Sequence, residues 1–156
     1  MSVAFRRDVD EEHLEPRPEL PVPPGPNLVT PRGMTLIEAR VAEFETALTA
    51  AATEEETKAI ERDLRYWRAR RATAQVMPAF VGDTIRFGAR VTYQDAAGKT
   101  HRVDLVGADE AGPAEGRIAF TSPLARALIG AAEGDLIDFG GKTEALEVVS
   151  IGAISD

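Results

Sequence analysis

The sequence predicts an α+β protein in which an antiparallel helical hairpin precedes an antiparallel sheet domain with one short helix. Two changes of pattern support this prediction. In the first half of the chain, apolar residues recur every three or four positions, which is the period of an amphipathic helix. After residue 77 they recur at every second position, which is the period of a half-buried strand. A chain of 156 residues has room for one such domain and an appendage.

Residues 1–29 are predicted to form a flexible or extended tail. Its first part is acidic and its second part is rich in proline: Asp8, Asp10, Glu11, Glu12 and Glu15 precede Pro16, Pro18, Pro21, Pro23, Pro24 and Pro26. Proline lacks a backbone N–H and fixes its own φ angle, so this composition opposes helix and sheet alike.

Residues 30–76 are predicted to form a hairpin of two helices that pack as a short antiparallel coiled coil. Thr30 can cap a helix whose first residue is Pro31. Thr53 and Glu56 match a capping box for the second helix, which places the tip of the hairpin just before them. The two apolar stripes are Ile37, Val41, Phe44 and Leu48, then Ile60, Leu64, Trp67 and Ala74. Helices of about 20 residues would make an arm about 30 Å long.

Residues 77–156 are predicted to form the sheet domain. Apolar residues alternate from Ile85 to Tyr93, and residues 95–99 form a turn. Further strands are expected at 101–106, 117–121, 135–139 and 145–151, with Gly140 and Gly141 turning the last pair. Ser122 can cap a short helix that begins at Pro123.

Composition excludes several classes of function. The formal net charge of -8 argues against binding bare nucleic acid through a global positive field. The absence of cysteine excludes disulfides and thiolate metal sites, and only two histidines, His13 and His101, are present, so no histidine-based catalytic or metal site is expected. No apolar run is long enough to cross a bilayer, and residues 1–10 lack the apolar segment of a signal peptide. We expect a soluble cytoplasmic protein without a membrane partner.

Three segments in fixed order carry a resemblance to a known family. Asp109–Ala111, Glu115–Ile118 and Thr121–Gly130 together closely resemble the C-terminal signature of the GreA/GreB-type transcription elongation factors. Phe87–Thr92 is similar to the family's first sheet strand, and Val29–Gly33 to the start of its coiled-coil domain. The resemblance is specific over residues 77–151 and moderate over 28–76, and it does not extend to the tail.

The resemblance implies a monomeric regulator of transcription elongation that binds bacterial RNA polymerase. In the family the coiled-coil arm enters the secondary channel of the polymerase, and an FKBP-like globular domain binds the channel rim. The residues that match the rim-binding positions are Asp109, Glu110, Ser122, Pro123 and Arg126. From the residues alone, the loop that holds the two carboxylates is an exposed acidic turn. Ser122 and Pro123 also fit a plain helix cap, and Leu124, Leu128 and Ile129 fit core packing.

The arm tip bears on whether the protein stimulates transcript cleavage. Family members that do so present acidic side chains at the tip, which help to hold a second Mg²⁺ at the polymerase active site. Here the tip offers Glu54, Glu55 and Glu56, but the tip motif of the cleaving members is missing. The arm is also shorter by about a dozen residues per helix, or about 18 Å. We therefore expect no cleavage, no enzymatic activity, and no metal or cofactor of the protein's own. The glutamates are interpreted first as acids that favour a helix start.

The second helix is basic within an acidic protein. Arg62, Arg65, Arg68 and Arg71 form a candidate patch for transcript RNA, as in the family, and Arg70 adds to it. A solvated face that pairs with Glu61 and Asp63 fits equally well.

Two other functions stay open. One is a cleavage factor that uses the tip glutamates on a shared Mg²⁺. The other is a regulator of a different enzyme, as in the short-armed regulators of nucleoside diphosphate kinase that resemble this family.

Overall fold

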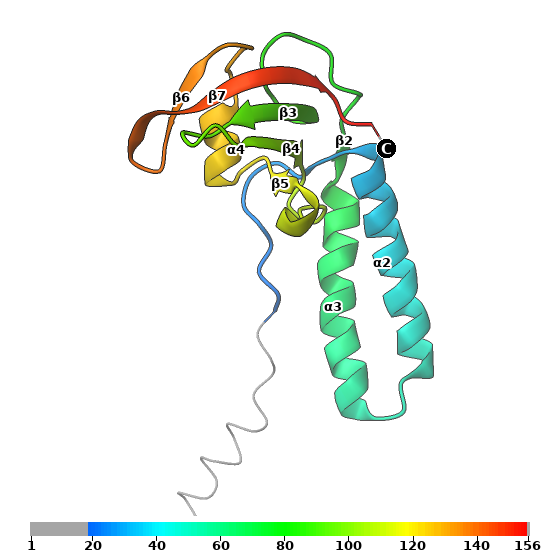
Figure 1. Cartoon of the computed structure of the whole chain (residues 1–156). Coiled ribbons are helices and arrows are strands. Elements are labelled where there is room, and N and C mark those ends of the chain that lie inside the picture. The colour runs from blue at the N-terminus through cyan, green and yellow to red at the C-terminus, as the bar shows by residue number, and fades with distance from the viewer. Residues whose placement is uncertain (1–18, 156) are drawn as a thin grey trace, which may run out of the picture.

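The computed structural model describes residues 19–155, which form a helical arm and a sheet domain joined at the root of the arm (Figure 1). The arm and its root contain β1 (Leu28–Val29), α2 (Pro31–Ala50), α3 (Glu54–Thr73) and β2 (Gln75–Val76). The sheet domain contains β3 (Ala89–Gln94), β4 (Thr100–Val106), the 3₁₀ turn η1 (Pro113–Glu115), β5 (Arg117–Ala119), α4 (Pro123–Leu128), β6 (Leu136–Phe139) and β7 (Lys142–Ala153). The predicted α+β fold with an N-terminal helical hairpin is confirmed.

The two arm helices begin where their capping residues predict. Thr30 Oγ1 accepts the N–H of Gly33 at 3.0 Å, and Pro31 is the first residue of α2. Thr53 Oγ1 accepts the N–H of Glu56 at 3.1 Å at the start of α3. In a capping box the Glu56 carboxylate would accept the N–H of Thr53. Here it accepts the N–H of the preceding residue, Ala52, at 3.1 Å. Both helices have 20 residues, as predicted.

Packing between the helices is tightest toward the root of the arm. Ile37, Val41 and Leu64 are fully buried. The other members of the predicted stripes, namely Phe44, Leu48, Ile60, Trp67 and Ala74, are half-buried. Since a helix this short draws most of its stability from tertiary packing, the root end anchors the arm and the tip depends on its caps.

The root is closed by a two-stranded parallel ladder between β1 and β2, in which Leu28 pairs with Gln75 and Val29 with Val76. Just before β1, the buried Asn27 donates from Nδ2 to the carbonyl of Arg70 at 2.9 Å. The predicted tail is therefore wrong for residues 27–29, which are fixed by these bonds. Residues 19–26 form no helix or strand, and the predicted tail residues 1–18 lie outside the described part of the chain.

The larger sheet has five strands in the order β5-β4-β3-β7-β6. β3 lies antiparallel to both β4 and β7, and β6 lies antiparallel to β7. β5 runs parallel to β4, with Asp104 opposite Arg117 and Val106 opposite Ala119. The predicted antiparallel sheet is confirmed for β3, β4, β6 and β7 but is wrong for β5, because residues 107–116 carry the chain back before β5 begins. This returning segment contains the loop that contacts the arm.

The core of the sheet domain lies between the sheet and α4. The predicted alternation is confirmed, since Ile85, Ala89, Val91 and Tyr93 are buried, although β3 itself begins only at Ala89. α4 contributes Ala125 and Leu128 to the core, and Leu124 packs against it. Ile129 was predicted to pack there as well, but it is 40% exposed.

The last hairpin turns as predicted. Phe139 pairs with Lys142 across Gly140 and Gly141, which have φ angles of 64° and 78°. Two consecutive positive φ angles are what a tight two-residue hairpin loop requires. No helix in the described part of the chain combines the length and the apolar character needed to span a membrane.

Candidate functional site

The loop after β4, residues 107–110, fastens the sheet domain to both helices of the arm. On the α3 side, Asp109 Oδ2 accepts a hydrogen bond from Arg70 Nε at 2.6 Å, and Oδ1 accepts one from the Tyr66 hydroxyl at 2.5 Å. Arg70 Nη2 also donates to Asn27 Oδ1 at 2.8 Å. The network thus joins the loop, α3 and the segment before β1. We call these four residues the α3 latch.

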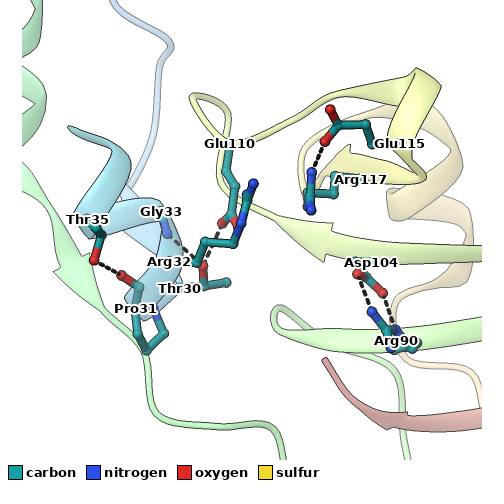
Figure 2. Close-up of polar contacts among 10 residues, drawn as sticks. All are labelled: Thr30, Pro31, Arg32, Gly33, Thr35, Arg90, Asp104, Glu110, Glu115 and Arg117. Carbon is teal, nitrogen blue, oxygen red and sulfur yellow. Dashed lines mark hydrogen bonds and ion pairs between the residues drawn. The ribbon is translucent and has the colours of Figure 1, made fainter. Parts of the chain in front are cut away.

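On the α2 side, the next residue of the loop makes an equivalent attachment. Glu110 Oε1 accepts a hydrogen bond from the Thr30 hydroxyl at 2.5 Å, and Oε2 pairs with Arg32 Nη1 at 3.1 Å (Figure 2). Thr30 therefore serves twice, since its oxygen also caps α2. A Cβ atom on Gly33 would lie 2.9 Å from Glu110 Oε1, so a glycine here makes room for the carboxylate.

The prediction that Asp109 and Glu110 form an exposed acidic turn is wrong. The Asp109 side chain is 7% exposed and that of Glu110 is 4% exposed. The turn faces the root of the arm, where Arg70 and Arg32 supply the opposite charges that make burial of carboxylates tolerable. Contact of these two residues with a partner stays a prediction, but their present contacts are with the arm.

The latch alters the titration of one of its members. Burial, together with the hydrogen bond to the Asp109 carboxylate, raises the pKa of Tyr66 to about 12. A tyrosine that donates to a carboxylate resists losing its proton, because ionisation would place two negative charges side by side. The Tyr66 hydroxyl therefore stays protonated at physiological pH and keeps its donor role.

The start of the loop is pressed against β1. A Cβ atom on Gly107 would lie 2.5 Å from the carbonyl oxygen of Leu28, a distance that real Cβ atoms do not adopt. Only glycine allows the two backbones to approach this closely. The loop is therefore fixed on three sides, by β1, α2 and α3.

The remaining predicted docking residues lie at the start of α4. Ser122 Oγ accepts the N–H of Ala125 at 3.3 Å, and Pro123 is the first helical residue, so the helix-cap interpretation is confirmed. Pro123 and Arg126 are exposed. Among the residues that the structure describes, Arg126 forms no ion pair. The structure thus separates the five predicted docking residues into a buried pair and an exposed helix start.

Two hollows flank the loop. One, of about 330 Å³, is lined by Pro23, Pro24, Pro26, Asn27, Arg70, Ala108, Phe120, Thr121 and Arg126. The other, of about 190 Å³, lies at the root of the arm and is lined by Glu110, Thr30, Arg32, Arg117 and apolar residues that include Phe80 and Phe87. In the second hollow, Arg117 already pairs with Glu115 and Arg32 with Glu110, as Figure 2 shows.

The three tip glutamates occupy the first turn of α3. Glu54 pairs with Lys58 at 3.3 Å one turn further along, and Glu56 caps the tip as described above. Glu55 is exposed in the same turn. Within residues 19–155, no group of three or more acidic or histidine side chains is placed to hold a metal ion. The contacts of Glu54 and Glu56 are those of acids at a helix start.

Three of the four arginines in the candidate RNA patch have acidic partners. Arg65 Nε pairs with Glu19 at 2.8 Å, Arg68 with Glu45 at 3.0 Å, and Arg62 with Asp63 at 3.6 Å. Arg71 is exposed and has no ion pair among the described residues. Arg70 belongs to the α3 latch and does not face solvent, since its side chain is 4% exposed. Contact of the patch with RNA stays a prediction.

Tyr66 and Asn27 were not singled out from the sequence, and Arg70 was assigned to a surface patch. Tyr66 and Arg70 are four residues apart on α3 and so share a helix face, a spacing that could have singled them out. Asn27 and Gly107 offer no comparable signal, because the groups they contact are distant in the sequence.

Comparison with known proteins gives consistent matches. A family model described as "Transcription elongation factor, GreA/GreB, C-term" matches residues 80–154. Transcription elongation factor GreA of Methylococcus capsulatus is 39% identical over 106 residues, which cover 64% of this chain and 67% of that protein. GreA of Brucella canis is 42% identical over 73 residues, or 45% of this chain and 46% of that protein, so the match spans less than half of this second relative.

Solved structures of similar proteins include the GreA factor homolog 1 (Gfh1) of Thermus thermophilus. The match is 18% identical with a TM-score of 0.39, and it covers 83% of this chain and 100% of that one. The GreA/GreB factor of Nitrosomonas europaea is 16% identical with a TM-score of 0.40, covering 83% and 99%.

Proposed function

This chain belongs to the GreA/GreB family of transcription elongation factors, and from this premise we propose that it regulates elongation by binding RNA polymerase at its secondary channel. In this proposal the sheet domain binds the rim of the channel and the arm points inward. The arm modulates the polymerase without stimulating transcript cleavage, and the protein brings no cofactor of its own.

The exposed start of α4 is the proposed contact surface on the sheet domain. Pro123 and Arg126 are exposed, and Arg126 has no ion pair among the described residues, so its charge is available to a partner. Ala125 and Leu128 fix the same helix in the core, so the surface is rigid. A rigid surface with an arginine is a frequent centre of binding energy, because little ordering entropy is lost on association.

Asp109 and Glu110 serve binding in a different way. Their carboxylates contact Arg70 and Arg32 at the root of the arm. In the proposal they set the direction of the arm relative to the docking surface, and they do not themselves contact the polymerase. The observation that carries the proposal is that Asp109 and Glu110 attach the loop to α3 and to the start of α2, because these contacts tie the sheet domain and the arm into one unit.

The proposal that the arm does not stimulate cleavage rests on its tip. The two helices of 20 residues span about 30 Å. The resemblance implies that cleaving members reach about 18 Å further. Metal ligands must lie within a few tenths of an ångström of their ideal distance, so a tip that ends short cannot share the catalytic ion.

Stimulation of cleavage is the second candidate function, and one observation favours it. The Glu54 side chain is 84% exposed, at the end of the arm farthest from the sheet domain. Carboxylate oxygens are the ligands that Mg²⁺ prefers.

A cleavage assay on backtracked elongation complexes tests the proposal. We expect the wild-type protein to bind these complexes and to leave the transcript length unchanged. The control is Arg126→Glu, which should weaken binding. Shortened transcripts that disappear with Glu54→Gln, Glu55→Gln or Glu56→Gln would contradict the proposal and establish the second candidate.

A further inference from the structure

The hollow beside α4 differs in charge from the rest of the molecule. The protein carries a net charge of -8. Yet among the described residues this hollow is lined by two arginines, Arg70 and Arg126, and by no aspartate or glutamate. The other polar side chains in its lining are Asn27 and Thr121. Because Arg70 is paired with Asp109, the positive charge in this lining that lacks a described counter-ion is that of Arg126, and a positive group in an acidic protein attracts a negative group of a partner.

One wall of this hollow comes from outside the region that the family model covers. Residues 19–27, which we call the proline strap, contribute Pro23, Pro24, Pro26 and Asn27 to the lining. The family model matches only residues 80–154. The wall is therefore a feature of this chain that the family match does not include.

The proline strap is held at both ends. At its C-terminal end, Asn27 is hydrogen-bonded to Arg70 and, from Nδ2, to Thr73 Oγ1 at 3.1 Å. At its N-terminal end, Glu19 pairs with Arg65 on α3 at 2.8 Å. The prolines between these points have fixed φ angles, so the wall is ordered before any partner binds. A preordered wall loses little entropy on binding.

The charges in the hollow define what it can bind. The guanidinium of Arg70 is already engaged by Asp109 and Asn27. Arg126 is exposed and has no ion pair among the described residues, so it is the cation that remains for a ligand. Phe120 and the prolines supply apolar surface next to it. The volume of about 330 Å³ is at the small end of ligand pockets, enough for one or two side chains.

We propose that this hollow receives a carboxylate-bearing side chain of RNA polymerase together with an adjoining apolar group, and that the proline strap forms one wall of that pocket. The proposal rests on the function proposed above. The carboxylate pairs with Arg126, and the apolar group packs against Phe120 and the prolines. A phosphate of RNA is the less favoured ligand, because a single available cation within an acidic protein is a weak phosphate site.

Substitutions in the wall test the proposal through binding of the full chain to purified core RNA polymerase. Pro24→Glu places a carboxylate in the wall and should weaken binding by about tenfold or more, since like charges repel across an interface. Pro21→Glu makes the same change in the proline strap at an exposed residue that does not line the hollow, and should bind like the wild type. Arg126→Glu should weaken binding, and Arg126→Lys should retain most of it.

The outcomes separate this proposal from the proposed function. If the wild type does not bind the polymerase, the proposed function fails and this inference fails with it. If the wild type binds and Pro24→Glu binds as well as Pro21→Glu, only the pocket is contradicted. The pocket is also contradicted if Pro24→Glu leaves polymerase binding intact but abolishes binding of a short single-stranded RNA. Thermal unfolding of each variant confirms that the fold is retained.

Discussion

The guanidinium of Arg70 and the carboxylate of Asp109 meet at 2.6 Å where the arm joins the sheet domain. Their side chains are only 4% and 7% exposed. Arg70 belongs to a helix for which the sequence predicts a basic surface, and Asp109 belongs to a loop for which it predicts an exposed acidic turn. Their pairing joins the two segments in a buried contact at the root of the arm.

Removing the negative charge of this pair should destabilise the protein strongly. Asp109→Asn leaves the Arg70 guanidinium buried without its counter-ion, and breaking a buried pair in this way costs about 3 kcal/mol. Urea unfolding followed by the fluorescence of Trp67, the only tryptophan, measures the loss. Trp67 packs edge-on against Tyr66 at a centroid distance of 5.1 Å, so it reports on the latch itself.

A matched control for this variant is an exposed ion pair in the same arm. Glu43→Gln removes a pairing with Arg40 in which the side chains are 57% and 47% exposed. Its loss should cost about 0.5 kcal/mol or less. If Asp109→Asn and Glu43→Gln lowered the free energy of unfolding by the same amount, the buried pair would not stabilise the contact between the arm and the sheet domain.

Tyrosine titration gives a second test of the latch. Because burial and the Asp109 carboxylate raise the pKa of Tyr66 to about 12, it should ionise well above the ordinary value near 10. Its proton stabilises the fold fully below pH 10, and that contribution is lost as the pH rises from about 10 to about 12. Absorbance of tyrosinate in Tyr93→Phe, which leaves Tyr66 as the only tyrosine, measures the pKa. In the double variant Tyr93→Phe/Asp109→Asn, the pKa of Tyr66 should fall. An unchanged pKa would contradict the hydrogen bond between Tyr66 and Asp109.

The close approach of Gly107 to Leu28 predicts a steric effect. Gly107→Ala would place its Cβ atom 2.5 Å from a backbone carbonyl that cannot rotate away, so the loop or β1 must shift. A loss of about 1–3 kcal/mol is expected for such overpacking. Gly112→Ala is the control in the same returning segment, because its Cβ atom would meet nothing within 4 Å. Denaturant unfolding should distinguish the two, and similar stabilities would show that β1 is not packed against the loop.

Removal of the helix cap at the arm tip should destabilise the arm and leave the sheet domain unchanged. Thr53→Ala removes the acceptor of the Glu56 N–H and should cost about 1 kcal/mol. Hydrogen exchange should then show faster exchange in the first turn of α3 and unchanged protection in the sheet. Thr49→Ala, near the end of α2, deletes a hydroxyl that is bonded only to a carbonyl of its own helix, and should leave the first turn of α3 protected.

Local features of this fold could be predicted from the sequence because local residues determine them. Thr30, Thr53 and Ser122 cap helices where predicted, and Gly140 and Gly141 turn the last hairpin. The direction of β5 could not be predicted in this way, because it depends on the path of residues 107–116.

The burial of the candidate site depended on partners distant in the sequence. Asp109 and Glu110 carry a charge pattern typical of an exposed turn, and they are buried because Arg70 and Arg32, with the hydroxyls of Tyr66 and Thr30, lie opposite them. In the same way, Asn27 follows a run of prolines that indicates an extended tail, and its contacts with Arg70, Thr73 and Gln75, all distant in the sequence, fix it. The exposed start of α4 was predicted correctly as a helix cap because that signal is local.

Photo-crosslinking from the arm tip tests the central claim most directly. A photoreactive amino acid at Ala52, which is exposed at the tip, is activated in the complex of the full chain with RNA polymerase. We predict crosslinks to the polymerase subunits that line the secondary channel, and their loss when Asp109→Asn releases the arm. Crosslinks confined to the outer surface of the polymerase, or a complete absence of crosslinks, would contradict it.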